Sequence, residues 1–176
     1  QILKTPVFLV PVIGSMIYQI FKRNYKKLFK EIKDFFDMKQ RLYLDTSIWR
    51  DYYEDRSDSS KPLGRLALQL LLKIIRENSQ IVYSDFVVEE LKIKYNKEEI
   101  IAIFSIFYHL GLLIKTSISN EQAKEAAVLC TKRNVSFGDA LHAILARDTK
   151  SIMVTRDKQF LRLRNIGDIK KPEDLL

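Results

Sequence analysis

Cysteine, histidine and glycine are scarce in this chain of 176 residues, and each scarcity excludes a class of site. The single cysteine, Cys130, excludes a disulfide within the chain. With only two histidines beside it, a cysteine-based zinc site is a poor fit. The five glycines include no set with the spacing of a phosphate-binding loop. A chain without disulfides suits a reducing compartment, so we expect a cytoplasmic location.

The composition is that of a basic, globular protein. With 176 residues, of which 47% are hydrophobic, the chain is long enough to form one domain with a substantial core. Its net charge of +8 and isoelectric point near 9.5 suit a polyanionic partner. Many soluble proteins are basic, so this charge gains weight only together with a site that handles phosphate.

Residues 1–37 differ from the rest of the chain. Residues 5–21 are apolar and almost uncharged, and the stretch that follows is basic. The apolar run is at the short end for a membrane span, and a signal peptide fits poorly because the charge follows it. Three interpretations stay open: a membrane anchor, a helix that binds a partner, or an extension upstream of a natural start at Met38. Membrane contact through residues 5–21 is not favoured, and we expect the functional domain to cover residues 38–176.

From residue 39 onward, strand-like and helix-like patterns alternate. Short apolar runs predict strands at residues 41–44, 80–84, 112–116, 151–155 and near Ile169. Apolar residues at helical spacing predict helices at residues 47–54, 63–76, 85–95, 97–109, 120–132, 137–148 and 158–162. We expect Asp85 and Asn120 to cap two of these helices. Strands that alternate with helices indicate an α/β fold with a mainly parallel sheet.

Four acidic residues stand next to these structural signals. Asp45 ends the first strand, and Glu90 lies in the helix after the second. Asp139 opens a later helix, and Asp157 follows the fourth strand. Because strand carboxyl ends and helix starts face one edge of an open α/β sheet, we expect the four carboxylates to gather there. Such a cluster needs a cation, and hard oxygen ligands favour Mg²⁺ or Mn²⁺ over zinc. In a basic protein, this pattern indicates phosphodiester hydrolysis.

Each of these residues also has a simpler structural interpretation. Asp45 would cap the helix that follows it, and Asp139 would complement the positive end of its helix dipole. Glu89 and Glu90 point about 100° apart on a helix, so only one of them faces the site. A lone histidine on a mostly apolar helix is more often structural than catalytic, so we leave His142 outside the site.

Four short blocks of sequence, taken in order, resemble the PIN-domain family of metal-dependent ribonucleases, which includes the VapC-type toxins of toxin–antitoxin pairs. The resemblance spans residues 38–176, and its blocks are residues 44–47, 90–91, 138–143 and 155–160. It implies an α/β/α sandwich with a central, mainly parallel sheet. It also favours the functional interpretation of the acidic residues over the structural one, and it selects Glu90 rather than Glu89.

The resemblance implies a set of site residues. The catalytic residues and ligands of Mg²⁺ or Mn²⁺ are Asp45, Glu90, Asp139 and Asp157. The hydroxyls expected to support these carboxylates belong to Thr46, Ser47 and Thr155. The weaker candidates for binding phosphate are Arg50, Arg156 and Lys158.

The function expected from these residues is metal-assisted hydrolysis of RNA by an endoribonuclease. This route leaves 5′-phosphate and 3′-hydroxyl ends. The resemblance suggests the toxin of a toxin–antitoxin pair, with RNA and an antitoxin protein as partners. Exposed aromatic side chains near Trp49 and Tyr53 would contribute to the antitoxin groove, although a core role fits them equally well. We also expect a homodimer, formed through the apolar residues 100–113 or through the N-terminal segment.

Other functions fit the sequence less closely. A housekeeping RNA-processing nuclease would use the same site. A non-catalytic RNA-binding or scaffold domain would keep the fold alone, and the presence of all four acidic residues argues against it. A haloacid-dehalogenase-like phosphatase needs a second aspartate two residues after the nucleophilic one, whereas Thr46 and Ser47 follow Asp45.

Overall fold

The computed structural model describes residues 22, 24–29, 39–58 and 60–176, and the chain divides into two units, residues 1–39 and 40–176. The described part of the first unit is helical at residues 22 and 24–29. Residues 5–21 lie outside the described part of the chain, so the three interpretations of that segment stay predictions. Among the residues that are described, no helix is long and apolar enough to cross a membrane.

The second unit is built on a five-stranded sheet in which every neighbouring pair of strands is parallel. The strands are β1 (Arg41–Leu44), β2 (Gln80–Ser84), β3 (Leu113–Thr116), β4 (Ile152–Val154) and β5 (Ile169–Lys170). Their order is β3-β2-β1-β4-β5, so the first strand lies at the centre and Leu42 is opposite both Ile81 and Ile152. The predicted parallel sheet is confirmed.

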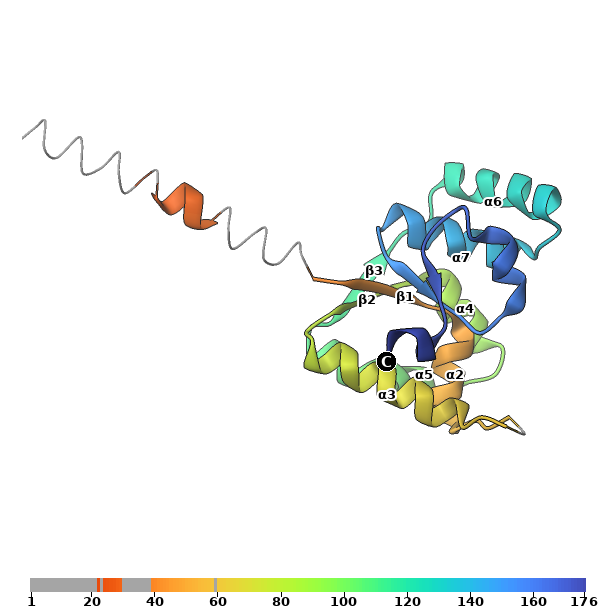
Figure 1. Ribbon diagram of the computed structural model, residues 1–176, viewed down its shortest axis with the longest axis horizontal. Coiled ribbons are helices and arrows are strands. Elements are labelled where there is room, and N and C mark those ends of the chain that lie inside the picture. The colour runs from red at the N-terminus through yellow and green to blue at the C-terminus, as the bar shows by residue number, and fades with distance from the viewer. Residues whose placement is uncertain (1–21, 23, 30–38, 59) are drawn as a thin grey trace, which may run out of the picture. The chain divides into compact units, whose positions relative to one another are not determined.

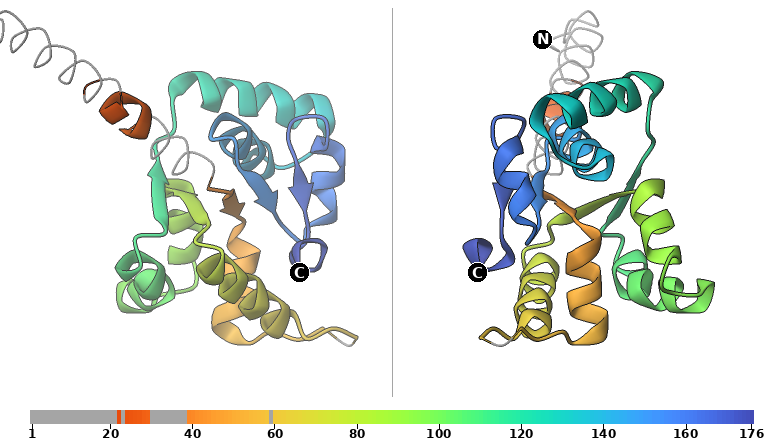
Figure 2. Two further views of the ribbon diagram at one scale, coloured as in Figure 1. Left: turned by 60° about the vertical axis from the view of Figure 1, so that its left-hand side comes forward. Right: turned by 90° about the vertical axis from the view of Figure 1, so that its right-hand side faces the viewer.

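Helices cover both faces of this sheet. They are α2 (Thr46–Glu54), α3 (Leu63–Arg76), α4 (Asp85–Lys92), α5 (Lys97–His109), α6 (Asn120–Arg133) and α7 (Phe137–Asp148), with short 3₁₀ helices η1 (Lys158–Leu163) and η2 (Pro172–Leu175). Figures 1 and 2 show α6 and α7 on one side of the sheet and α2, α3 and α5 on the other. The result is the expected α/β/α sandwich, with β1, β2 and β4 all pointing toward the edge where α2 and α4 begin (Figure 1).

Hydrophobic periodicity explains most of these helices. In α3, the buried apolar residues recur at helical spacing and face the core, namely Ala67, Leu70, Leu71 and Ile74. Helix α5 starts at a capping box in which Asn96 and Glu99 satisfy each other's backbone N–H groups. Helix α7 starts at Ser136, whose hydroxyl accepts a hydrogen bond from the Asp139 N–H at 3.0 Å.

Two predicted caps are wrong. Ser119, not Asn120, caps α6, because its extended backbone lets its hydroxyl accept from the Gln122 N–H while the Gln122 side chain bonds back. Asp85 is the first residue of α4 rather than its cap, and its carboxylate pairs with Lys115 at 2.6 Å. Helix α4 also ends at Lys92 instead of residue 95.

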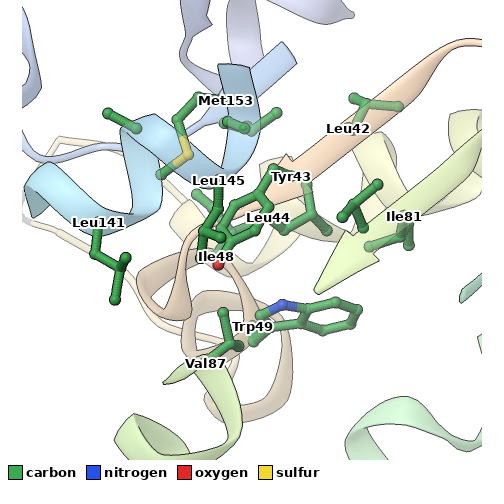
Figure 3. Close-up of a cluster of buried hydrophobic side chains, with 14 of the residues drawn as sticks. Leu42, Tyr43, Leu44, Ile48, Trp49, Ile81, Val87, Leu141, Leu145 and Met153 are labelled. Carbon is green, nitrogen blue, oxygen red and sulfur yellow. The ribbon is translucent and has the colours of Figure 1, made fainter. Parts of the chain in front are cut away.

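The core lies around β1, and Figure 3 shows its central side chains. Tyr43 and Trp49 are both fully buried. The Trp49 ring packs against Phe104 and Phe107, with ring centroids 4.6 Å and 5.6 Å away. Trp49 therefore has the core role of its two interpretations, whereas Tyr53 is 39% exposed.

Candidate metal centre

Asp45 stands at the junction of β1 and α2. Its backbone N–H donates to the Val154 carbonyl at 3.0 Å, which extends the contact between β1 and β4 by one residue. Although Asp45 occupies the N-cap position of α2, its side chain makes no capping hydrogen bond. Instead, Oδ2 accepts from the Ser47 hydroxyl at 2.5 Å and from the Thr155 hydroxyl at 3.0 Å. The capping interpretation of Asp45 is wrong, and two predicted supporting residues hold its carboxylate in place.

Glu90 lies on α4, across from Asp45. Its Oε2 accepts hydrogen bonds from the Thr46 hydroxyl and from Nε2 of His142, the latter at 3.0 Å. Burial opposes ionisation of Glu90, but the hydrogen bonds from His142 and Thr46 outweigh it and hold the pKa of Glu90 below its ordinary value. The neighbouring Glu89 points to solvent and pairs with Lys92 at 2.7 Å. Of the two glutamates, Glu90 is therefore the one that faces the other acidic residues.

Asp139 lies in the first turn of α7 and is partly buried. Burial raises the pKa of Asp139 above its ordinary value, against the hydrogen bonds at Ser136, and the negative charges of Asp157 and Asp45 raise it further. Carboxylates influence each other's ionisation in this way only when they lie close together. Asp139 thus connects the acidic residue after β1 with the one after β4.

Asp157 is exposed and has a structural task of its own. Its Oδ1 accepts from the Gln159 N–H at 2.8 Å and so caps η1, while its own N–H donates to the Thr155 hydroxyl at 3.1 Å. Thr155 therefore contacts both Asp45 and Asp157. The loop after β4 is fixed to the end of β1 by this one side chain.

The chemistry of these donors fits a divalent cation. One ligand atom from each of Asp45, Glu90 and His142 lies within 4.8 Å of the others. The oxygens are hard ligands of the kind that Mg²⁺ and Mn²⁺ prefer. Burial is the main cause of the raised pKa of Asp139, and the charges of Asp157 and Asp45 add to it; a bound cation would relieve this repulsion between carboxylates.

His142 is the contact that sequence reasoning left out. It is 1% exposed, its Nε2 bonds Glu90, and its Nδ1 lies 3.0 Å from the Tyr43 hydroxyl. The available signal was its position one turn after Asp139 on α7, which places both side chains on the same side of the helix. Composition alone could not reveal that Glu90 lies opposite this position, because the two residues are 52 apart in the chain.

The three predicted phosphate-binding residues differ in whether their side chains already form ion pairs with carboxylates. Arg156 is held in the fold, with Nε 2.8 Å from the fully buried Asp51 and Nη1 2.7 Å from Glu173. Arg50 pairs with Glu54 at 3.3 Å. A phosphate would have to compete with these carboxylates for either arginine. Neither arginine is therefore a good candidate for binding phosphate.

Lys158 is exposed beside Asp157. It lines a cavity of about 220 Å³ between η1 and the end of β5, together with Thr155, Asp157 and three further basic residues, Arg164, Lys170 and Lys171. Lys158 is therefore the predicted phosphate-binding residue that lies among other basic side chains. Its binding of phosphate stays a prediction.

The sequence of this domain matches a known protein family. The PIN domain family model matches residues 42–166, which is most of the described domain. The chain belongs to the PIN domain family. No curated protein sequence matches it.

Two solved structures share the fold of this PIN domain. One is VapBC2 from Rickettsia felis bound to a DNA fragment from their promoter, with 20% identity and a TM-score of 0.55. The match covers 75% of this chain and 98% of that one. The other is a toxin–antitoxin complex from Klebsiella pneumoniae, with 20% identity and a TM-score of 0.53 over 74% of this chain and 97% of that one. At such identities the likeness establishes the fold.

Proposed function

We propose that this PIN domain is a metal-dependent endoribonuclease. The observation that supports the proposal most is the convergence of Asp45 and Glu90, which come from separate elements and offer ligand atoms within 4.8 Å of each other. Asp139 lies close enough to Asp45 and Asp157 for their charges to raise its pKa, in addition to the effect of burial. Such a cluster opposes folding through its own repulsion, so its presence in one place is typical of a functional site.

Each residue has a distinct task in this proposal. Asp45, Glu90 and Asp139 hold Mg²⁺ or Mn²⁺, and Asp157 adds charge from the exposed side. A bound cation of this kind supplies an activated water and offsets negative charge at the phosphate. Thr46 steadies Glu90, while the hydroxyls beside Asp45 keep one of its oxygens occupied and leave the other for the cation.

The basic cavity beside Asp157 supports RNA as the substrate. Its four cationic side chains lie next to the carboxylate cluster, where they would contact the phosphates that flank the cleaved bond. The cavity also contains Asp157 and Asp174, so its charge is mixed rather than uniformly positive. The overall charge of +8 agrees with a polyanionic substrate.

A toxin of a toxin–antitoxin pair is the biological role that we propose, acting in the cytoplasm. The support is the likeness in fold to two complexes of this type. Expression of the native chain alone should arrest bacterial growth, and Glu90→Gln should relieve the arrest. Unimpaired growth with active native protein would instead favour a housekeeping RNA-processing nuclease.

The exposed apolar face of α5 supports the proposed homodimer. Ile101 and Tyr108 are 57% and 74% exposed, and they line an apolar groove of about 400 Å³ together with Tyr83, Phe104 and Leu113. Light scattering should give a dimer for the native chain and a monomer for Ile101→Glu/Tyr108→Glu. A native monomer, or a double variant that remains dimeric, would contradict this surface as the interface.

The activity itself is tested by a matched pair of glutamates on one helix. Native protein, Glu90→Gln and Glu89→Gln are incubated with a mixed single-stranded RNA pool and Mn²⁺. We expect the native protein and Glu89→Gln to cleave RNA equally, with 5′-phosphate ends, and Glu90→Gln or added EDTA to abolish cleavage.

Other results would redirect the proposal. Equal cleavage by all three proteins would indicate a contaminant or a different site. Products ending in a 2′,3′-cyclic phosphate would exclude the hydrolytic route. RNA binding without any cleavage would favour the non-catalytic alternative.

A further inference from the structure

A chain of hydrogen bonds runs from the core to Glu90. The Tyr43 hydroxyl lies 2.8 Å from the Ser84 hydroxyl and 3.0 Å from Nδ1 of His142, and Nε2 of His142 lies 3.0 Å from Oε2 of Glu90. Tyr43, Ser84 and His142 are all essentially inaccessible to solvent. Tyr43 belongs to the group of core side chains drawn in Figure 3. This series of hydrogen bonds thus joins the buried core to the candidate metal centre.

The direction of these hydrogen bonds follows from elementary chemistry. An ionised carboxylate only accepts, so Nε2 of His142 carries a proton and donates to Glu90. In the neutral ring, Nδ1 is then an acceptor, and Tyr43 donates to it. The Ser84 hydroxyl donates to Tyr43 in turn, so every polar group in this series of hydrogen bonds has a partner.

Packing alone does not explain a histidine at this place. The ring lies among apolar and aromatic neighbours, 5.1 Å from the Phe86 ring and 5.6 Å from the Tyr43 ring, measured between centroids. A leucine would fill similar space without the penalty of desolvating two nitrogens. Within the described part of the chain, the charged group to which the histidine is hydrogen-bonded is Glu90.

The other carboxylate oxygen of Glu90, Oε1, lies beside Gly138. A Cβ atom added to Gly138 would lie 3.4 Å from Oε1 of Glu90 and 3.2 Å from the Phe86 ring. Glycine at this position therefore leaves room beside Oε1, at the start of the helix that carries Asp139. Oε2 is occupied by Thr46 and His142, whereas no hydrogen bond to Oε1 is found among the described residues.

We propose that His142, held by Tyr43, is a positioning residue that occupies Oε2 of Glu90 and presents Oε1 to the divalent cation. The proposal rests on the proposed metal-dependent function. His142 does not itself bind the cation, because its Nε2 proton is directed at the carboxylate. Ligating side chains in metal sites are commonly held by hydrogen bonds of this kind, whose loss weakens metal binding by roughly 10- to 100-fold.

Two substitutions separate the two ends of the ring. His142→Gln places its amide where Nε2 was and can still donate to Glu90, whereas His142→Asn is shorter and reaches only toward Tyr43. We expect Mn²⁺ titrations, followed by paramagnetic resonance of the free ion, to give near-native affinity for His142→Gln. For His142→Asn the affinity should fall roughly 10- to 100-fold. Circular dichroism melting curves in EDTA confirm that each variant is folded.

A third variant avoids any loss of volume in the core. Tyr43→Phe keeps the ring and removes only the hydroxyl that orients His142. We expect a smaller loss of Mn²⁺ affinity in the same direction. Native affinity in this variant would overturn the part assigned to Tyr43, and this result can be read even where His142→Asn does not fold.

The ring itself can be observed without metal. Long-range ¹H–¹⁵N spectra of the metal-free protein should show His142 protonated at Nε2. A ring protonated at Nδ1 alone would overturn the proposal, because Nε2 could then not donate to Glu90. This measurement does not depend on cation binding.

The metal titrations distinguish failure of this inference from failure of the proposed function. Native affinity in His142→Asn, in a protein whose Mn²⁺ binding is abolished by Asp45→Asn, would overturn the positioning role and leave the metal site intact. Equal weakening by His142→Asn and His142→Gln would also overturn it. A native chain that binds no Mn²⁺ would remove the proposed function, and the inference with it.

Discussion

The acidic site has two halves that are built differently. Asp45 and Glu90 each have one carboxylate oxygen fixed by two side-chain hydrogen bonds, from Ser47 and Thr155 in the first case and from Thr46 and His142 in the second. Asp139 and Asp157 lie at the starts of helices: the Asp139 N–H donates to the Ser136 hydroxyl, and the Asp157 carboxylate accepts from the Gln159 N–H. The first half is mostly buried, whereas Asp157 is exposed.

The two pairs of carboxylates are therefore held in position by different contacts. Side-chain hydrogen bonds fix the orientation of the first pair before any cation arrives, which lowers the reorganisation needed on binding. The second pair lies in the first turn of α7 and at the cap of η1, and burial together with acidic neighbours raises the pKa of Asp139. We therefore expect Asp45, in the first pair, to matter more for metal affinity than Asp157. Substitutions of Glu90 and Asp139 should change the stability of the metal-free protein in opposite directions.

The largest expected effect compares Asp45→Asn with Asp157→Asn. Loss of the Asp45 charge should reduce Mn²⁺ affinity by more than the roughly 10- to 100-fold typical of a supporting residue, because Asp45 is itself a proposed ligand. Asp157→Asn should have a much smaller effect, since its charge is exposed and screened by solvent. Isothermal titration with Mn²⁺ measures both. Equal losses in the two variants would erase the distinction between the halves.

An intermediate effect concerns the stability of the protein without metal. Glu90→Gln should lower it by about 1 kcal/mol, since the hydrogen bonds that Glu90 accepts favour its charged form. Asp139→Asn should raise it, because burial and the neighbouring carboxylates disfavour the charged form of Asp139. For a chain of this size, each kcal/mol corresponds to a melting temperature shift of roughly 2–4 °C. Melting curves in EDTA at pH 7 should therefore shift in opposite directions.

Lowering the pH should remove both differences. The advantage of Asp139→Asn is present above the raised pKa of Asp139 and disappears as the pH falls through it, since the native residue then becomes neutral. The deficit of Glu90→Gln is present above the ordinary glutamate pKa and disappears as the pH falls through the lowered pKa of Glu90. The Asp139 effect should vanish at the higher pH of the two. The reverse order would contradict the assigned shifts.

The smallest expected effect lies outside the carboxylates, in the basic cavity. Lys158→Gln should weaken RNA binding in EDTA and reduce the dependence of log K on log salt concentration by about 0.7, the value for one single-strand phosphate contact. Lys124→Gln, on the exposed side of α6, serves as the matched control and should leave the slope unchanged. Fluorescence anisotropy at several salt concentrations gives both slopes. Identical slopes would exclude Lys158 from the RNA path.

Much of the fold could be predicted from the sequence, because the core pattern is local and periodic. The strands and helices of residues 41–170 appear where apolar spacing placed them, with ends displaced by three residues or fewer. Helix η2 was not foreseen. It is held by distant partners, Lys73 bonding the Leu175 carbonyl at 2.5 Å and Arg156 bonding Glu173. No local pattern records such contacts.

The candidate site could likewise be predicted from the sequence only in part. Asp45, Glu90 and Asp139 could be selected because each follows a local signal of a strand end or a helix turn. The roles of His142 and Arg156 could not be read in this way. The sequence favours a structural role for His142, which contacts Glu90, and a phosphate-binding role for Arg156, which pairs with Asp51. In both cases the deciding partner lies far away in the chain.

The sequence by itself determined most of the strands and helices and which carboxylates stand at the edge of the candidate site, because these properties depend on local spacing. The tertiary structure alone decided which oxygen of Glu90 is free, which arginine is already neutralised and which histidine reaches the site. These properties depend on distances of 3 Å between groups that are 52 and 105 residues apart in the chain, and only the packed sheet and helices set such distances.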